Sequence, residues 1–264
     1  MSDKAKKIVI LIMIIVFILI FLICSYILIK NFLDFEESKS ENTKLINDVI
    51  DVPINNKNIE NSKNSKDNED SEYIANNESH EMIVNWNKLE NINKDIIGWI
   101  KINDTKINYP ILQDSNLYYL NHTYYNKYNR NGSIFTQTRN PFETKETVIY
   151  GHNNRNGIMF NEIENFMDVD FFDRHQTFQI YTKNANYDAK VFSIYSIGID
   201  EENQNIKNLS FDECVEYYKN QSKFKRQNQD ITDNIIKLST CSYLNNKETP
   251  TEQRYYLVSS LVKN

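Results

Sequence analysis

One uninterrupted apolar run near the N-terminus limits what this chain can be. Residues 8–29 form a stretch of 22 residues in which only Ser25 is clearly polar, and a helix of that length crosses the roughly 30 Å hydrocarbon core of a bilayer. Lysines precede the run at positions 4, 6 and 7, and flanking lysines stay on the cytoplasmic side. The run is too long for a cleaved signal peptide and lacks an Ala-x-Ala-like exit. We therefore predict a single-pass signal anchor over residues 1–30, with a cytoplasmic N-terminus and the rest of the chain outside the cell membrane.

The region that follows the predicted anchor is polar and acidic. Residues 34–80 contain twelve Asp or Glu residues against five Lys, and almost no aromatic residues. Such a composition buries too little apolar surface to offset the entropy of ordering, so we predict a disordered acidic linker over residues 31–80. Residues 81–264 are close to electroneutral and rich in Tyr and Phe, which predicts the globular domain. Because this domain has no stripe of basic residues, nucleic acid is not expected as a partner.

The globular domain contains many short segments with the composition and alternation of β-strands. Helical periodicity is confined to residues 82–93, 158–172 and 210–225. Eight or so strands with few helices predict a mainly β fold, closed or nearly closed into a barrel, with flanking helices. The expected strands are residues 99–103, 106–113, 133–138, 147–153, 178–182, 187–197, 235–243 and 253–258.

Three of the expected strands place reactive side chains at their ends. Cys241 lies near the end of one strand, His152 at the end of another, and Arg254 at the start of a third. A thiol reacts as its thiolate, which a neighbouring imidazolium stabilises, and the same imidazole can then protonate a leaving amine. Arginine keeps its charge and can donate to a developing oxyanion. Since no acidic residue occupies an obvious orienting position, we predict a Cys-His-Arg site for acyl transfer rather than a Cys-His-Asp triad.

Each of these residues also has an ordinary structural interpretation. Cys241 is compatible with a small buried apolar residue, His152 with a turn residue, and Arg254 with a surface charge. The other two cysteines are accounted for: Cys24 lies in the predicted span, and Cys214 lies on the apolar face of a helix that opens with a capping-box pattern. An unpaired thiol on a domain outside the cell needs a reason, and no His/Cys spacing predicts a metal site. Composition and spacing alone leave the choice open.

The motifs around the three residues resemble the signature of sortases. Leu-Ser-Thr-Cys occupies residues 238–241, Tyr-Gly-His-Asn occupies residues 150–153, and Arg254 opens the last strand. The order His, Cys, Arg along the chain is also that of sortases, whereas papain-like proteases place the cysteine first. The predicted helix at the start of the domain and the helix inserted before the cysteine strand are similar to those of class B sortases. Further class B resemblance lies in residues 97–100, 107–113, 132–135 and 157–160.

This resemblance implies an eight-stranded sortase-type β-barrel and a cysteine transpeptidase. By resemblance, Cys241 would attack the threonine carbonyl of a C-terminal sorting motif on a secreted protein. His152 would act as acid and base, and Arg254 would hold the scissile carbonyl or the oxyanion. The thioacyl-enzyme would then pass the protein to an amine of the peptidoglycan cross-bridge or of its lipid-linked precursor. No cofactor and no metal are implied.

The resemblance also implies where a substrate binds. Ser239 and Thr240 precede the thiol on its strand and are expected to shape the groove, with Thr240 facing opposite to Cys241 because side chains alternate along a strand. Asn153 and Tyr243 complete the expected substrate-binding residues. The segment between residues 199 and 233 is expected to form a recognition wall beside the groove.

Other functions are compatible with the sequence. A pilin-polymerising sortase would use the same thiol with a lysine of another protein as the acceptor, and a wall-associated cysteine hydrolase would use water. From outside enzymology, the chain is also compatible with a membrane-tethered adhesin or a non-catalytic binding module. The sorting motif is open as well: an Asn-Pro-Gln-Thr-Asn-like motif is the class B expectation, with Leu-Pro-x-Thr-Gly and related motifs as alternatives.

Overall fold

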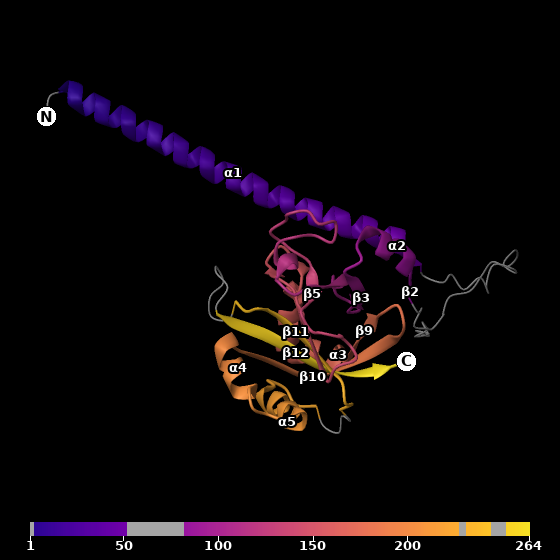
Figure 1. Cartoon of the computed structure of the whole chain (residues 1–264). Helices are drawn as coiled ribbons and strands as arrows, with labels where there is room; N and C mark the ends of the chain where they lie inside the picture. The colour runs from indigo at the N-terminus through magenta and orange to yellow at the C-terminus, as the bar shows by residue number, and fades with distance from the viewer. Residues whose placement is uncertain (1–2, 52–81, 227–230, 244–251) are drawn as a thin grey trace, which may run out of the picture.

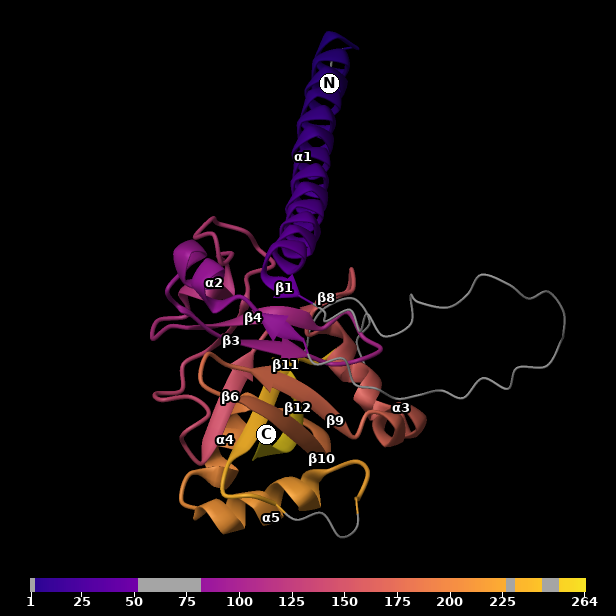
Figure 2. The same cartoon turned by 90° about the vertical axis from the view of Figure 1, so that its right-hand side faces the viewer.

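The computed structural model describes residues 3–51, 82–226, 231–243 and 252–264. A closed β-barrel carries short helices on its outside, and one long helix extends away from it (Figures 1 and 2). The predicted mainly β fold with flanking helices is confirmed. The strands of the barrel are β3 (Ile96–Lys101), β4 (Asn108–Gln113), β5 (Ile134–Thr136), β6 (Glu146–Tyr150), β9 (Thr177–Tyr181), β10 (Asn186–Gly198), β11 (Ile235–Cys241) and β12 (Gln253–Lys263).

The order of strands around the barrel brings distant parts of the chain together. It is β10-β12-β11-β6-β5-β4-β3-β9, and β9 closes the ring on β10. Most neighbours are antiparallel, but β11 runs parallel to β6 and β4 runs parallel to β5. The central position of β11, between β6 and β12, is therefore what joins the cysteine strand to both of the other strands predicted to carry chemistry.

The long helix α1 contains the predicted membrane span. It runs from Asp3 to Val49, and the apolar side chains of residues 8–29 project outward with no protein packed on them. Both views show this part of α1 extending well beyond the barrel (Figures 1 and 2). By length and composition α1 is able to cross a membrane.

Beyond the span, α1 continues as an ordered helix along the domain. Asn131 Nδ2 donates to Ser38 Oγ over 3.1 Å, and Lys127 Nζ lies 2.8 Å from Glu41 Oε1. The predicted disordered linker is therefore wrong over residues 31–51. Half of the face that docks on the domain is polar, so this segment lacks the apolar content by which an ordered helix is recognised in a sequence. Residues 52–80 lie outside the described residues. The buried face of this segment repeats every three or four residues, as one side of a helix does, and consists of Ser38, Glu41, Leu45 and Val49.

The elements outside the barrel differ in places from the predicted helices. Residues 83–84 pair with residues 50–51 as strands, so the first helix begins only at Trp86, capped by the Asn85 side chain. The predicted helix over residues 158–172 opens instead as a strand. These elements are β1 (Ile50–Asp51), β2 (Ile83–Val84), α2 (Trp86–Ile92), η1 (Tyr118–Leu120), β7 (Asn153–Asn154), β8 (Ile158–Met159), η2 (Asn161–Met167), α3 (Val169–Arg174), α4 (Ile199–Ile206) and α5 (Phe211–Gln221).

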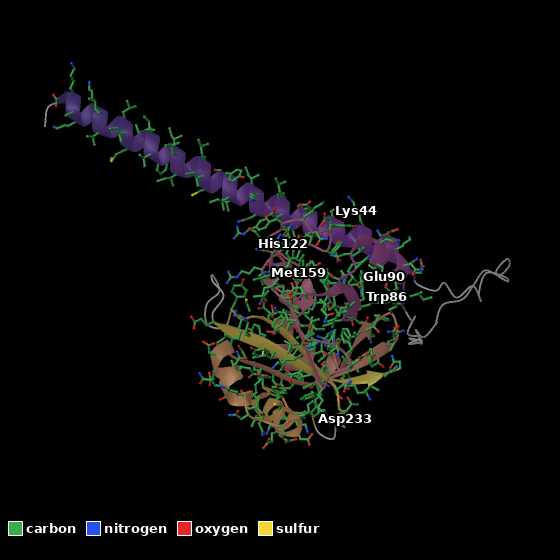
Figure 3. The ribbon with its side chains drawn as sticks, in the orientation of Figure 1. Lys44, Trp86, Glu90, His122, Met159 and Asp233 are labelled. Carbon is green, nitrogen blue, oxygen red and sulfur yellow. The ribbon has the colours of Figure 1, made fainter. Side chains whose placement is uncertain are left out.

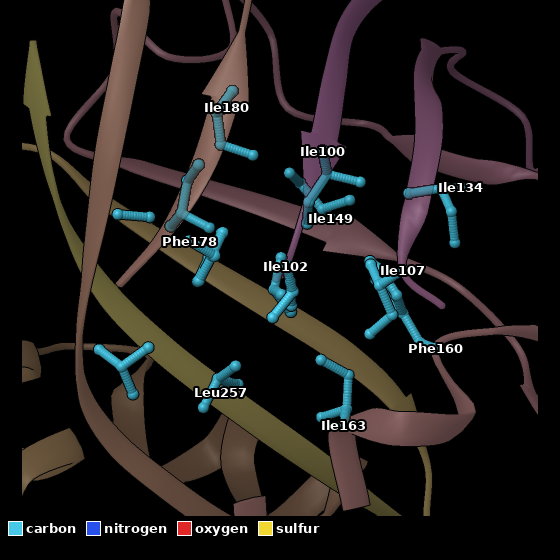
Figure 4. Packing of buried hydrophobic residues seen from close by; sticks show 14 of the residues in the cluster. Ile100, Ile102, Ile107, Ile134, Ile149, Phe160, Ile163, Phe178, Ile180 and Leu257 are labelled. Atoms are coloured by element: carbon cyan, nitrogen blue, oxygen red, sulfur yellow. The ribbon is translucent and has the colours of Figure 1, made fainter. Parts of the chain in front are cut away.

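The interior of the barrel is filled by aliphatic and aromatic side chains from facing strands. Figure 4 shows them in the space between the strands, with Ile163 of η2 beside them. Burial of this kind stabilises the fold by about 25 cal/mol per Å² of apolar surface, and it fixes which face of each strand points outward. Fully buried members include Ile100, Ile149, Phe178, Ile180 and Leu257.

Helices α4 and α5 cover part of the outer face of the barrel. Tyr218 of α5 packs there against Tyr195 of β10, and α5 lies below the barrel in Figure 2. The predicted helix over residues 210–225 is confirmed over Phe211–Gln221, and both hydrogen bonds of its capping box form between Ser210 and Glu213. The eight residues of α4 were not predicted as a helix.

A buried lysine joins this helical cover to the cysteine strand. Lys237 of β11 is only 4% exposed, and its Nζ lies 3.2 Å from both Glu146 Oε1 and Glu202 Oε1. The ammonium also lies 4.8 Å from the centre of the Tyr218 ring. Glu202 belongs to α4 and is 1% exposed, so one ion pair is sealed between α4 and β11.

Candidate active site

Strand register brings the three predicted catalytic residues to one end of the barrel. Cys241 and Arg254 are direct cross-strand partners in the antiparallel pair of β11 and β12. On the other side of β11, Ser239 pairs with Tyr150 in the parallel pair with β6, and the Gly151 amide donates to the Ser239 carbonyl over 3.2 Å. Cys241 and His152 each lie two residues beyond this pair, Cys241 at the end of β11 and His152 just past the end of β6. In the register of the strands, Cys241 thus lies between Arg254 on one neighbouring strand and His152 just beyond the end of the other.

Asn153 ties the histidine segment to the cysteine strand. Its Nδ2 donates to the Cys241 carbonyl over 2.9 Å and to Glu164 Oε2 over 3.2 Å. Its Oδ1 accepts from Asn161 Nδ2 over 2.8 Å, and its own carbonyl accepts from the Tyr243 hydroxyl over 3.0 Å. The side chain is buried. Asn153 therefore fixes the spacing between the backbone that carries the imidazole and the backbone that carries the thiol.

The ring of His152 is oriented by a backbone carbonyl. His152 lies just beyond β6, which ends at Tyr150, and its Nε2 is 2.8 Å from the carbonyl oxygen of Leu120. With the Nε2 proton donated there, Nδ1 is the nitrogen available for exchanging a proton with a sulfur or an amine. Leu120 was not identified from the sequence, because a backbone acceptor carries no side-chain signature.

The environment of His152 disfavours its charged form. Burial lowers the pKa of the imidazole below its ordinary value of 6.5, and the positive charge of Arg254 lowers it further, while the bond to the Leu120 carbonyl acts in the opposite direction. Between pH 6.5 and the lowered pKa, the unfolded chain binds more protons at this residue than the folded chain does. Stability contributed by neutral His152 is therefore present above pH 6.5 and is lost as the pH falls through that range.

We expect the titration midpoint of His152, followed by its ring-proton NMR shift in detergent, to lie below pH 6.5. Replacing Arg254 with glutamine should raise the midpoint, because one repelling positive charge is removed. Arg174→Gln is the matched control: this arginine bonds to the Asp170 carbonyl within α3 and is not among the groups that shift the pKa of His152, so it should leave the midpoint in place. A midpoint at or above 6.5 in the parent chain would contradict this assignment.

The four residues predicted to bind substrate differ in how much surface they offer. Ser239 and Thr240 are only 5% and 2% exposed, and Asn153 is buried as well. Tyr243 is half-buried, and the guanidinium of Arg155 lies 4.4 Å from the centre of its ring. A substrate-binding role for these residues stays a prediction. The position of Arg155 was not anticipated from the sequence.

The remaining features of this end of the barrel are structural. The Ser242 amide donates to the Gln253 carbonyl over 3.0 Å, so pairing with β12 continues past the thiol. Arg254 Nη1 donates to the same carbonyl over 3.1 Å. The other cysteine of the domain, Cys214, is half-buried on α5 against the outer apolar cluster, as predicted. Within the described ranges, no group of three or more His, Cys, Asp or Glu side chains is placed to hold a metal ion.

Comparisons with known proteins agree with this geometry. The profile of the sortase domain family matches residues 100–262. Sortase B of Listeria monocytogenes is 40% identical over 161 residues, which cover 58% of this chain and 65% of that protein. Sortase B of Staphylococcus aureus is 32% identical over 185 residues, covering 66% of this chain and 73% of that protein.

The fold is likewise that of solved sortase B structures. The crystal structure of sortase B from B. anthracis superposes with a TM-score of 0.64 at 26% sequence identity, covering 88% of this chain and all of that one. The chain spans about two thirds of the length of the Listeria relative. On these matches, it belongs to the sortase family, in its class B branch.

Proposed function

We propose that this chain is a membrane-anchored cysteine transpeptidase that joins secreted proteins to the peptidoglycan of the cell wall. The proposal rests on one observation above all: Cys241 and Arg254 are direct cross-strand partners, with His152 at the corresponding position beyond the parallel strand on the other side. A nucleophile between an acid–base and a fixed cation is the arrangement that acyl transfer needs.

In the first step, the Cys241 thiol gives its proton to neutral His152, and the thiolate attacks the carbonyl carbon of the threonine in the sorting motif. Negative charge develops on the carbonyl oxygen, and the Arg254 guanidinium stabilises it; one such donor is worth about 3–4 kcal/mol of barrier. The carbon–nitrogen bond then breaks, and the His152 imidazolium gives its proton to the leaving amine. The product is a thioester between Cys241 and the secreted protein, with His152 neutral.

In the second step, an amine of the peptidoglycan cross-bridge or of its lipid-linked precursor attacks the thioester carbon. Neutral His152 takes the proton that this amine loses, and the carbon–sulfur bond breaks to return the thiolate. The new amide joins the protein to the wall, and the return of a proton from His152 to the thiolate restores the starting protonation states of both residues. An Asn-Pro-Gln-Thr-Asn-like motif is the substrate that we propose for a class B enzyme.

We assign the groove and the membrane topology within the same proposal. Tyr243, the half-buried member of the four candidate substrate-binding residues, is proposed to contact the peptide, and the buried Ser239, Thr240 and Asn153 to support the groove from below. The segment between residues 199 and 233 lines one side. The N-terminus lies in the cytoplasm, residues 8–29 cross the membrane, and the barrel lies outside.

The test follows the mass of full-length chain, in detergent, mixed with a panel of sorting-motif peptides with and without a short glycine or diamino-acid amine. We expect an acyl adduct on Cys241 and, with amine present, a product joined to that amine. Cleavage of peptide that ignores added amine would favour a cysteine hydrolase, and joining to a protein lysine alone would favour a pilin-polymerising enzyme. Folded chain that binds peptides and leaves all of them intact would favour a non-catalytic binding module.

A further inference from the structure

The loop between β4 and β5 contacts α1 directly beyond the apolar run. Lys30 is the first residue after that run, and its Nζ lies 5.8 Å from the centre of the Tyr128 ring. Arg130 Nη1 donates to Asn31 Oδ1 over 2.6 Å. The tip of this loop therefore reaches the level along α1 at which the apolar residues end.

Contacts along α1 show how far other parts of the domain lie from Lys30, where the apolar run ends. Lys88 of α2 pairs with Asp48 over 2.8 Å, and Asp48 is 18 residues beyond Lys30, which is about 27 Å along a helix. Figure 3 shows the same order: Trp86 and Glu90 lie near the C-terminal end of α1, and His122 of the loop lies nearer its N-terminal end. The loop tip is thus the membrane-proximal part of the domain along this side of α1.

The exposed side chains of the loop suit the surface of a bilayer. Tyr128 is 57% exposed, and tyrosine is enriched where membranes meet water because its ring is apolar and its hydroxyl polar. Arg130, beside Asn31, has the charge that anionic lipid headgroups attract. The headgroup layer on each side of a bilayer is roughly 5–7 Å thick, and the Tyr128 ring lies beside Lys30, the residue at which the apolar run gives way to that layer.

We propose that the membrane-proximal tip of residues 117–131, which we call the interfacial loop, rests on the headgroup layer of an anionic bilayer, with Tyr128 inserted into that layer. The inference goes beyond the proposed reaction but rests on the membrane-anchoring part of the proposed function. Within the interfacial loop, the Leu120 carbonyl holds His152. Lipid contact therefore steadies the segment that orients the catalytic imidazole.

The test uses full-length chain in vesicles of phosphatidylcholine and phosphatidylglycerol, with bromine on the upper acyl chain as a quencher. Tyr128→Trp adds one tryptophan to two native ones, Trp86 and Trp99, which lie in the domain beside the far end of α1. We expect brominated lipid to remove up to a third of the fluorescence of this variant and to leave the parent chain unchanged. Arg130→Trp, at the exposed residue beside Asn31, is the second reporter, should Tyr128→Trp fail to fold.

Val169→Trp is the matched control, since Val169 is 47% exposed on α3, on the side of the barrel away from the N-terminal end of α1 (Figure 1). Flotation of the vesicles separately reports whether the chain is anchored. A chain that does not float with the vesicles would overturn the anchoring itself. A floating chain in which tryptophan at positions 128 and 130 is quenched no more than tryptophan at position 169 would overturn the membrane contact of the interfacial loop while leaving the anchor intact.

Discussion

Replacing Cys241 with alanine should abolish the acyl adduct and reduce transpeptidation by about 10³-fold or more, because the variant has no nucleophile to form the thioester. Cys241 is half-buried at a strand end, so loss of one sulfur should leave the barrel folded, which circular dichroism checks. The measurement is the mass of the protein and of the peptide products after incubation with a sorting-motif peptide and an amine.

The matched control for this change is Cys214→Ala. Cys214 is the other half-buried free thiol of the domain, and it lies on α5 against the outer apolar cluster. This variant should keep both the adduct and the joined product. An adduct that persists in Cys241→Ala, or one that disappears in Cys214→Ala, would place the nucleophile elsewhere. Peptide binding that survives Cys241→Ala, with no turnover in the parent chain, would support a binding module.

Lys237→Met should lower the free energy of unfolding by about 3–5 kcal/mol, since it leaves a buried carboxylate without its counter-charge. Glu202 is almost fully buried and keeps only the Tyr195 and Tyr217 hydroxyls as hydrogen-bond donors, at 2.6 Å and 3.0 Å. Glu146 loses the same partner. Urea unfolding in detergent, followed by tryptophan fluorescence, measures the change.

Two further variants make this prediction specific to the buried pair. Lys219→Met removes a lysine of α5 whose ion pair with Glu216 is exposed to solvent, and it should change stability by less than about 1 kcal/mol. Adding Glu202→Gln to Lys237→Met should recover much of the loss, because the uncompensated charge is then gone. Equal effects of Lys237→Met and Lys219→Met on the free energy of unfolding would show that burial does not increase the contribution of the Lys237 ion pair to stability.

Much of the barrel and the chemistry of its end could be predicted from the sequence. Strand alternation reports directly which residues face a core, and the motifs at residues 150–153 and 238–241 sit where strand ends meet. The pairing of Cys241 with Arg254 follows from register, which alternation alone does not set. The carbonyl of Leu120 could not be found, because the backbone is the same at every residue.

The extent of α1 was missed for a different physical reason. Its docking face includes Ser38 and Glu41, which are buried by hydrogen bonds and an ion pair to the interfacial loop rather than by apolar contact. Composition counts such residues as signs of disorder. Helix α4 was missed because it is short and has apolar residues only at its two ends, which is too few to show a helical period. Its stability depends on contacts such as the Glu202 pair with Lys237, which only the folded chain provides.

The unbroken course of α1 from the predicted span onto the barrel has a consequence for how substrates are found. A flexible linker would let the catalytic barrel sample a range of distances from the membrane. The continuous helix instead holds the barrel at one distance, so that it meets partners only as it moves parallel to the membrane surface. Partners at that distance from the membrane meet the enzyme at a high effective concentration, and partners deep in the wall do not. In a chain anchored as proposed, this geometry favours secreted proteins still held at the membrane, and acceptor amines still carried on lipid.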